Sequence, residues 1–293
     1  MRVPKGKLIA VGGNEDKGTY PNPKTRKRYT LDFFELGILK RLLIEVGKPN
    51  PHIEVVTTAS MIPLEVGRMY AGAFERLGVS DLPLMHIRTA EDSRRSEYLD
   101  RLRACDAIMF SGGDQSNITQ AFGGSEFLEI MLERYYEEPN FVIAGTSAGA
   151  MAMSRIMIAG GNPFNALKKG AVKVSAGLGL IDPVIIDSHF VKRGRFARLM
   201  EVIAENPHHI GLGLGEDTGV LITGGSQIET IGSNLVVIID GREIGHNNAF
   251  EARKGEMLSI EHLVVHILAK GNVYDLRRRQ FFASHSHPAP LQS

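Results

Sequence analysis

The sequence predicts an α/β fold in which a mainly parallel sheet carries helices on both faces. In the first two thirds of the chain, short apolar runs of β type alternate with segments of helical periodicity. The apolar runs are nearly continuous, which is typical of strands buried on both faces of a parallel sheet. After residue 209 the runs are shorter and are separated by Gly and Asp turns, so antiparallel or mixed additions are expected there.

The individual elements follow from the same periodicity. Strands of the sheet are expected at 7–13, 52–59, 82–87, 106–113, 141–145 and 184–190. Apolar residues recur at helical spacing in the segments between them, so helices are expected at 30–47, 64–78 and 125–138. The segment 193–205 is a further helix candidate.

The amino-acid composition limits which class of protein the chain can belong to. The chain has 293 residues, 43% of them hydrophobic and 23% charged, with a net charge of +1. These values fit one globular domain over 1–280, followed by a tail at 281–293 that is expected to be disordered. They give no reason to expect nucleic acid or a membrane as a partner. The basic segment 16–30 is interpreted as a solvated loop in preference to a substrate lid.

Cysteine usage and the first residues point to a cytoplasmic protein. The single cysteine, Cys105, excludes an intramolecular disulfide and a cysteine-rich metal site, and it is expected to be a buried structural thiol. The first residues carry too short an apolar run for a secretory signal.

A serine follows one expected strand in a pattern that suits a nucleophile. Parallel sheets place reacting groups where strands end, and Ser147 lies in the sequence GTSAG directly after 141–145. Glycines on both sides permit the sharp turn that exposes a serine Oγ between a strand and a helix. The alternative is a small residue in an ordinary tight turn. A nucleophilic serine also needs a base and an orienting partner elsewhere in the chain.

Two glycine-containing turns could surround a reacting carbonyl group. A helix that begins at Ser147 would direct the backbone N–H of Ala148 at an oxyanion. The Gly112–Gly113 pair ends another strand and could supply a second donor, although a plain turn is the alternative. The sequence GGNED at 12–16 lacks the spacing of a dinucleotide-binding loop.

His189 is the best candidate for the base among ten histidines. It follows an expected strand and precedes three arginines, Arg193, Arg195 and Arg198, which could bind a carboxylate of a substrate through paired hydrogen bonds. The alternative for the arginines is a solvated helix start. His262 and His266 are spaced as a pair on an expected helix and are interpreted as structural, not metal-binding.

The third member of such a site would be an acid after a later strand. Glu216 and Asp217 both follow a Gly-rich run and both remain candidates. The chain order serine, histidine, acid differs from that of the α/β-hydrolases, so it argues against that fold without arguing against the chemistry.

Four motifs in this order carry a family resemblance. FSGGDQSNIT, GTSAGAMAMS, DSHFVKRGRFARL and GLGLGEDTGVLI together resemble the cyanophycinases, which belong to a serine peptidase family that also contains aspartyl dipeptidases. The resemblance covers residues 6 to 240. It implies a flavodoxin-like three-layer α/β/α sandwich related to glutamine amidotransferases, a homodimer, and no metal or organic cofactor. Its substrate would be multi-L-arginyl-poly-L-aspartate, released as β-aspartyl-arginine dipeptides.

The resemblance also assigns residues position by position. It implies Ser147 as nucleophile, His189 as base and Glu216 as the third member. The positions that match the family's substrate pocket are Gln115, Asp187, Ser188, Arg193, Arg195 and Arg198. Arginines would bind the carboxylates of the polymer, and Asp187 would bind a guanidinium group.

This chain departs from the family pattern at a few positions. Ser188 stands where the family usually has Gln, Gly215 replaces a common acidic residue, and the segment 16–30 is longer than expected. These differences leave the serine peptidase interpretation intact and concern the substrate, for which a related aspartyl or isoaspartyl dipeptidase is the alternative. A separate hypothesis is a binding protein of the same fold without turnover.

Overall fold

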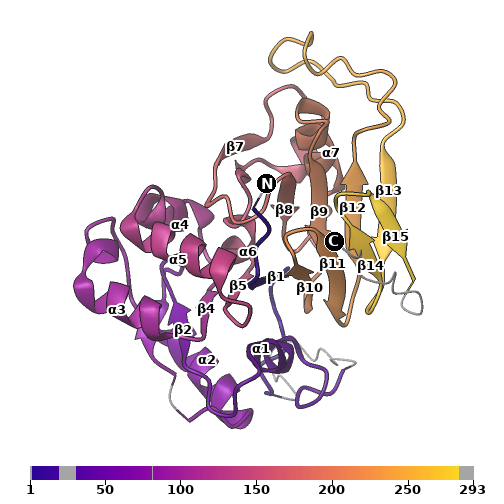
Figure 1. Ribbon diagram of the computed structural model, residues 1–293. Helices are drawn as coiled ribbons and strands as arrows, with labels where there is room; N and C mark the ends of the chain where they lie inside the picture. Colours follow the sequence, from indigo (N-terminus) through magenta and orange to yellow (C-terminus); the bar gives the residue numbers. More distant parts are fainter. Residues whose placement is uncertain (1, 20–30, 81, 284–293) are drawn as a thin grey trace.

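The computed structural model describes residues 2–19, 31–80 and 82–283, and its largest feature is a mixed β-sheet (Figure 1). Within these residues the sheet has nine strands in the order β15-β14-β11-β10-β1-β5-β4-β2-β3. Their bounds are β1 (Lys7–Val11), β2 (Ile53–Val56), β3 (Leu84–Met85), β4 (Ala107–Phe110), β5 (Val142–Thr146), β10 (Thr218–Thr223), β11 (Gln227–Gly232), β14 (Val273–Asp275) and β15 (Gln280–Phe282).

One half of this sheet is parallel and the other half is antiparallel. Strands β1, β5, β4, β2 and β3 pair in parallel, with Val11 opposite Thr146 and Phe110 opposite Gly145. On the other side of β1, the strands β10, β11, β14 and β15 pair antiparallel in succession. The expected antiparallel additions are therefore confirmed, and they make up a larger share of the sheet than predicted.

Helices cover both faces of the parallel half, as predicted. On one face, α1 (Ile38–Val46) and α2 (Pro63–Arg76) pack on side chains such as Ile9 and Val55. On the other face, residues of α3 (Ser96–Ala104), α4 (Gln115–Phe122), α5 (Glu126–Glu137) and α6 (Ala148–Met151) pack with Leu8, Phe110 and Ile143. Alternate residues of each buried strand thus face two separate cores.

A second sheet packs beside the antiparallel half and was not predicted. It has the order β13-β12-β9-β8, from β8 (Val184–Asp187), β9 (Ile210–Leu214), β12 (Val236–Asp240) and β13 (Val264–Leu268). Helix α7 (Phe196–Glu205) joins the parallel pair β8 and β9 and packs on β9. The expectation that 184–190 belongs to the main sheet is therefore wrong. The remaining elements are the hairpin β6 (Ile156–Gly160) and β7 (Lys173–Ala176) and the 3₁₀ turns Asp92–Arg94 and Pro163–Asn165.

The helix expected at 30–47 begins later than predicted. Helix α1 starts at Ile38, and Gly37 is its N-cap. Before it, the Asp32 carboxylate accepts hydrogen bonds from the backbone N–H groups of Phe34 and Glu35 and closes a local turn. A side chain that bonds its own backbone in this way competes with helix formation. Phe34 in this turn is 56% exposed.

Two other helix expectations also change. The candidate at 193–205 becomes helical only at Phe196, because Gly194 adopts a left-handed conformation with φ +58°. His262 and His266 do not lie on a helix: His266 is in strand β13, and His262 precedes the strand with φ +61°. In β13, partly buried and exposed residues alternate from Val264 to Ile267, which is the period of a strand, and this period outweighs the helical spacing of the two histidines.

Other expectations concern single residues and segments. Cys105 is buried at the end of α3, and burial raises the pKa of its thiol to about 12. Residues 20–30 of the basic segment and 284–293 of the tail lie outside the described residues. Among the helices that the structure describes, none is long and apolar enough to cross a membrane.

Close packing of α6 on β4 predicts a stability difference between two glycines. A Cβ on Gly149 would overlap the carbonyl oxygen of Phe110, whereas a Cβ on Gly160 would meet nothing within 4 Å. We expect Gly149→Ala to lower the free energy of unfolding by about 1–3 kcal/mol, as overpacking does. Gly160→Ala is the matched control and should change it by less than about 0.5 kcal/mol. Urea unfolding measures both, and equal values would contradict this packing.

Candidate active site

Ser147 lies at the sharp turn between β5 and α6. Its backbone has φ +51° and ψ −109°, an uncommon conformation for a residue with a side chain. The turn is tight because a Cβ on Gly145 would lie 2.6 Å from the carbonyl oxygen of Gly149. The N–H of Ser147 donates to the carbonyl oxygen of Val11, 2.8 Å away. The two glycines of GTSAG therefore permit the turn that the sequence pattern predicts.

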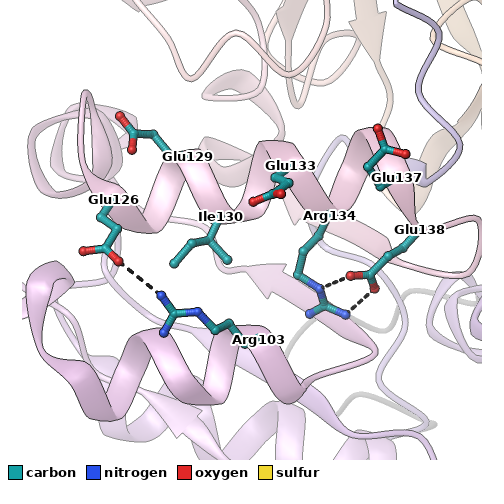
Figure 2. A pocket seen from close by; sticks show the side chains of 8 residues that line it. All are labelled: Arg103, Glu126, Glu129, Ile130, Glu133, Arg134, Glu137 and Glu138. Atoms are coloured by element: carbon teal, nitrogen blue, oxygen red, sulfur yellow. Dashed lines mark hydrogen bonds and ion pairs between the residues drawn. The ribbon is translucent and has the colours of Figure 1, made fainter.

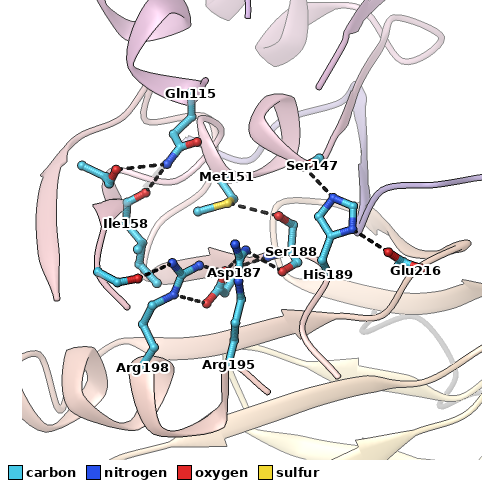
Figure 3. A network of polar contacts seen from close by, with 12 residues as sticks. Gln115, Ser147, Met151, Ile158, Asp187, Ser188, His189, Arg195, Arg198 and Glu216 are labelled. Atoms are coloured by element: carbon cyan, nitrogen blue, oxygen red, sulfur yellow. Dashed lines mark hydrogen bonds and ion pairs between the residues drawn. The ribbon is translucent and has the colours of Figure 1, made fainter. Parts of the chain in front are cut away.

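His189 follows β8 and faces Ser147. Its Nε2 lies 3.0 Å from Oγ of Ser147 (Figure 3). The residue is buried, has φ +46°, and donates its backbone N–H to the carbonyl oxygen of Gly12 at 2.8 Å. Gly13 lies against the ring, since a Cβ there would be 2.5 Å from ring atoms Cε1 and Nε2. A strand of the first sheet and a strand of the second thus bring the two side chains together.

Glu216 is the third side chain in a row that begins with Ser147 and His189, and it lies in the connection between β9 and β10. Its Oε1 lies 2.9 Å from Nδ1 of His189. The same Oε1 accepts a 2.6 Å hydrogen bond from Nδ2 of Asn14, and Nζ of Lys192 lies 3.2 Å from Oε2. Of the two acids left open by the sequence, Asp217 faces elsewhere: its Oδ1 accepts from the backbone N–H of Asp16 at 2.9 Å.

The surroundings of His189 favour its neutral form. Burial lowers the pKa of the imidazole, and the positive charges of Arg193 and Arg195 lower it as well, while the hydrogen bond to Glu216 opposes them. Because a carboxylate can only accept, the neutral ring carries its proton on Nδ1. The lone pair of Nε2 is then directed at Oγ of Ser147. The arrangement can remove a proton from a serine hydroxyl.

The glycine pair after β4 borders the serine. A Cβ on Gly112 would lie 3.3 Å from Cβ of Ser147, so the backbone of this turn passes directly beside the serine. Gly113 has φ +145°, and a Cβ there would overlap the carbonyl oxygen of Ala59. Ala148 follows Ser147 as the first residue of α6 and is buried. The turns of Gly113 and Ala148 are therefore both next to the serine.

Asp187 forms a buried ion network with two arginines of the chain itself (Figure 3). It is fully buried at the end of β8. Its Oδ1 accepts a hydrogen bond from Nη1 of Arg195 at 3.0 Å, and its Oδ2 accepts one from Nε of Arg198 at 2.8 Å. A second nitrogen of Arg198 also donates to Oδ1. The guanidinium partners expected from a substrate are thus supplied from α7 and the residue before it.

The three arginines differ in their access to solvent. Arg198 is buried and also donates to the carbonyl oxygen of Gly161 at 3.2 Å. Arg195 is partly buried and donates to the carbonyl oxygen of Ser188 at 2.8 Å. Arg193 is exposed on the turn before α7. Only Arg193 and part of Arg195 are open to a carboxylate from outside.

The other two expected pocket residues contact the chain itself. The hydroxyl of Ser188 is buried and donates to Sδ of Met151 at 3.2 Å. Gln115, the first residue of α4, donates from Nε2 to the carbonyl oxygen of Ile158 at 2.8 Å. Figure 3 shows Ser188 next to Asp187, and Gln115 next to Ile158.

Sequence reasoning gave no role to two residues that contact Glu216, namely Asn14 and Lys192. The rule that polar residues at strand ends form the site marks Asn14, which follows strand β1, but does not say what its amide does. Glu15 at the same strand end also received no role: it is buried and accepts a 2.6 Å hydrogen bond from Oγ1 of Thr146, the residue before Ser147. Although burial raises the pKa of Glu15, Lys17 and hydrogen bonds lower it to about 2, so the group is ionised.

A separate groove of about 550 Å³ lies between α3 and α5 (Figure 2). It is lined by Arg103, Glu126, Glu129, Ile130, Glu133, Arg134, Glu137 and Glu138. Arg103 pairs with Glu126 at 3.1 Å and Arg134 with Glu138 at 2.6 Å, so part of its charge is balanced internally. Its lining includes none of the strand-end residues around Ser147.

Comparison with known proteins agrees with the motifs. The model of Peptidase family S51 matches residues 36–230. A cyanophycinase of Synechococcus elongatus is 32% identical over 276 residues, which cover 94% of this chain and 81% of that protein. Cyanophycinases of Nostoc sp. and Geminocystis herdmanii are 30% and 31% identical, over 95% and 94% of this chain and 89% and 96% of theirs.

A solved structure shares the fold. The crystal structure of a peptidase from an acI-B1 Actinobacterium matches with a TM-score of 0.65 at 18% identity, covering 94% of this chain and 98% of that one. The family match spans more than half of the chain, and the related sequences align over nearly all of it. The chain therefore belongs to Peptidase family S51 and is a serine peptidase.

Proposed function

We propose that the protein hydrolyses cyanophycin, multi-L-arginyl-poly-L-aspartate, as an exopeptidase that releases β-aspartyl-arginine dipeptides. The observation that carries the proposal is the row Ser147, His189 and Glu216, joined at 3.0 Å and 2.9 Å. Similarity over nearly the whole chain to proteins named cyanophycinase supports the choice of substrate.

The proposed reaction begins with attack by Ser147 on the carbonyl carbon of the scissile amide. Nε2 of His189 takes the hydroxyl proton as the C–O bond forms, and Glu216 stabilises the resulting imidazolium. The backbone N–H groups of Ala148 and Gly113 are assigned to the oxyanion. The intermediate then collapses: the C–N bond breaks, the leaving amine receives the proton from His189, and an acyl-enzyme remains.

Water completes the cycle by the same route in reverse. His189 removes a proton from water, whose oxygen attacks the acyl carbon of the ester. When the second tetrahedral intermediate collapses, the proton returns to Oγ of Ser147 and the peptide acid is released. This chain's own side chains account for each proton transfer.

Recognition of the polymer is assigned to the arginine turn before α7. Exposed Arg193 and partly buried Arg195 are proposed to bind a free carboxylate of the substrate. Asp187 and Arg198 are proposed to support Arg195 instead of contacting substrate, because the Asp187 carboxylate is occupied by both arginines. Gln115 and Ser188 remain proposed pocket residues.

Several finer features stay predictions. They are the flavodoxin-like, amidotransferase-related architecture, the homodimer and the cytoplasmic location. The homodimer is tested by the sedimentation coefficient of the purified protein. A monomer at micromolar concentration would contradict it.

Loss of the serine hydroxyl should abolish turnover. Purified protein incubated with cyanophycin should release β-aspartyl-arginine, and Ser147→Ala should lower the rate roughly 10⁴-fold or more. Mass spectrometry of the soluble products measures the release. Release only from short aspartyl or isoaspartyl peptides would move the assignment to the related dipeptidases. Equal release by Ser147→Ala would contradict the mechanism.

The pH dependence of serine reactivity should reflect the lowered pKa of His189. Labelling of Ser147 by a fluorophosphonate should fall only as the pH drops through a value below the ordinary 6.5 of histidine. Arg193→Gln removes a positive charge that disfavours imidazolium. The acid limb of its labelling profile, which is the fall in labelling rate at low pH, should therefore move to higher pH.

Lys254→Gln makes the same charge change at an exposed position in the connection between β12 and β13, so it should leave the acid limb in place. A fluorophosphonate is used in place of the substrate because it has no carboxylate for Arg193 to bind, so the variant changes the charge near His189 without changing binding of the probe through that group. A shift of the acid limb to lower pH in Arg193→Gln would contradict the assignment of His189 as the base.

A further inference from the structure

We propose that Asn14 is a positioning residue of this active site, whose amide N–H group fixes the Glu216 carboxylate in place against His189. The inference rests on the proposed function, because it assigns Asn14 a role through the Ser147, His189 and Glu216 row. Neither the family motifs nor the chemistry of the triad requires an amide at this position.

The contact joins Asn14 to the oxygen that also faces His189. Oε1 of Glu216 accepts from Nδ2 of Asn14 at 2.6 Å and from Nδ1 of His189 at 2.9 Å. Because an ionised carboxylate only accepts hydrogen bonds, the nitrogen of the Asn14 amide must face it. Two donors converging on one oxygen limit rotation of the carboxylate about its last bond. Lys192 lies at the other oxygen, 3.2 Å away, but is mostly exposed.

The backbone beside Asn14 holds all three segments of the site. We call residues 11–14 the β1 turn. The carbonyl oxygen of Val11 accepts the N–H of Ser147 at 2.8 Å, and that of Gly12 accepts the N–H of His189 at 2.8 Å. The carbonyl oxygen of Gly13 accepts the N–H of Asp217, the neighbour of Glu216, at 2.9 Å. The side chain of Asn14 is the fourth contact in this series.

The contact has an electrostatic consequence for His189. The charged groups that face the ring are Glu216, Arg193 and Arg195, and Lys192 acts through its pair with Glu216. The neutral N–H donor of Asn14 on Oε1 partly offsets the negative charge that Glu216 directs at the imidazole. Without that donor, the carboxylate stabilises imidazolium more strongly, and the pKa of His189 rises.

A structural role for Asn14 makes a different prediction. Asn14 has φ +51°, and Gly, Asn and Asp all accept the left-handed conformation. If the residue only forms the turn, Asn14→Gly and Asn14→Asp should both behave as wild type. If its N–H positions Glu216, the first variant loses the donor and the second replaces it with a negative charge beside Glu216.

The experiment compares wild type, Asn14→Gly and Asn14→Asp with a charge-matched control, Asn50→Asp. Asn50 is exposed and precedes β2, so it lies at the amino ends of the parallel strands, whereas Asn14 follows the carboxyl end of β1. The pKa of His189 is read from its imidazole resonances in histidine-labelled protein, assigned with His189→Asn. The rate constant for fluorophosphonate labelling of Ser147 is measured at pH 7, and urea unfolding reports whether each variant is folded.

We expect the pKa of His189 to rise in the order wild type, Asn14→Gly, Asn14→Asp. Labelling should slow roughly tenfold in Asn14→Gly and up to about a hundredfold in Asn14→Asp, as misplacement of a reacting group does. On cyanophycin, kcat should fall while KM stays near the wild-type value. Asn50→Asp should match wild type in all three measurements.

The outcomes separate this inference from the proposed function. Folded Asn14→Gly with wild-type His189 pKa and labelling would overturn the positioning role, even if the enzyme degrades cyanophycin. If wild type does not degrade cyanophycin but both variants shift the pKa and slow labelling, the positioning role stands and the proposed substrate fails. If Asn14→Gly does not fold, Asn14→Asp decides, and an unchanged or lowered His189 pKa in that variant overturns the proposal.

Discussion

The close approach of two sheets at a pair of glycines is the constraint on which the rest of the site depends. Gly12 and Gly13 follow β1 at the place where the second sheet meets the first. A Cβ on Gly12 would overlap the carbonyl oxygen of Gly215, and one on Gly13 would lie 2.5 Å from the ring of His189. Only backbone without side chains fits between the sheets here. This fit brings β1 within hydrogen-bond distance of segments that come from both sheets.

Uncommon backbone conformations gather around this junction. Asn14, Ser147, His189 and Asp217 all have positive φ values between 46° and 51°. Each such residue raises the free energy of the folded state by about 1–3 kcal/mol unless its surroundings hold it. The carbonyl oxygens of the β1 turn supply part of that support, and the buried network of Asp187, Arg195 and Arg198 secures the end of β8. The residues with strained backbone and the contacts that hold them in that conformation therefore lie together at the junction of the two sheets.

Much of the site could be found in the sequence because strand ends are marked locally. GTSAG, DSHF and GED each follow an apolar run, and the structure brings Ser147, His189 and Glu216 within hydrogen-bond distance. The second sheet could not be found, because the apolar run of β8 reads like those of the main sheet. Asn14 also stands at a strand end, but an amide there lies in none of the motifs that assign a role, and its contact with Glu216 appears only in the structure. The helix predicted from residue 30 begins later because apolar periodicity does not reveal the turn that the Asp32 side chain closes.

Ser147, His189 and Glu216 come from strand ends of two different sheets, and this has a consequence for the chain before it is fully folded. Ser147 directly follows β5 of the first sheet, whereas His189 and Glu216 follow β8 and β9 of the second. A chain in which only the first sheet has formed holds Ser147 without its proposed base, and a free serine hydroxyl is a poor nucleophile. The three side chains can therefore act together only in a chain whose two sheets have docked. Until its two sheets meet, a newly synthesised copy holds Ser147 apart from the histidine that would take its proton.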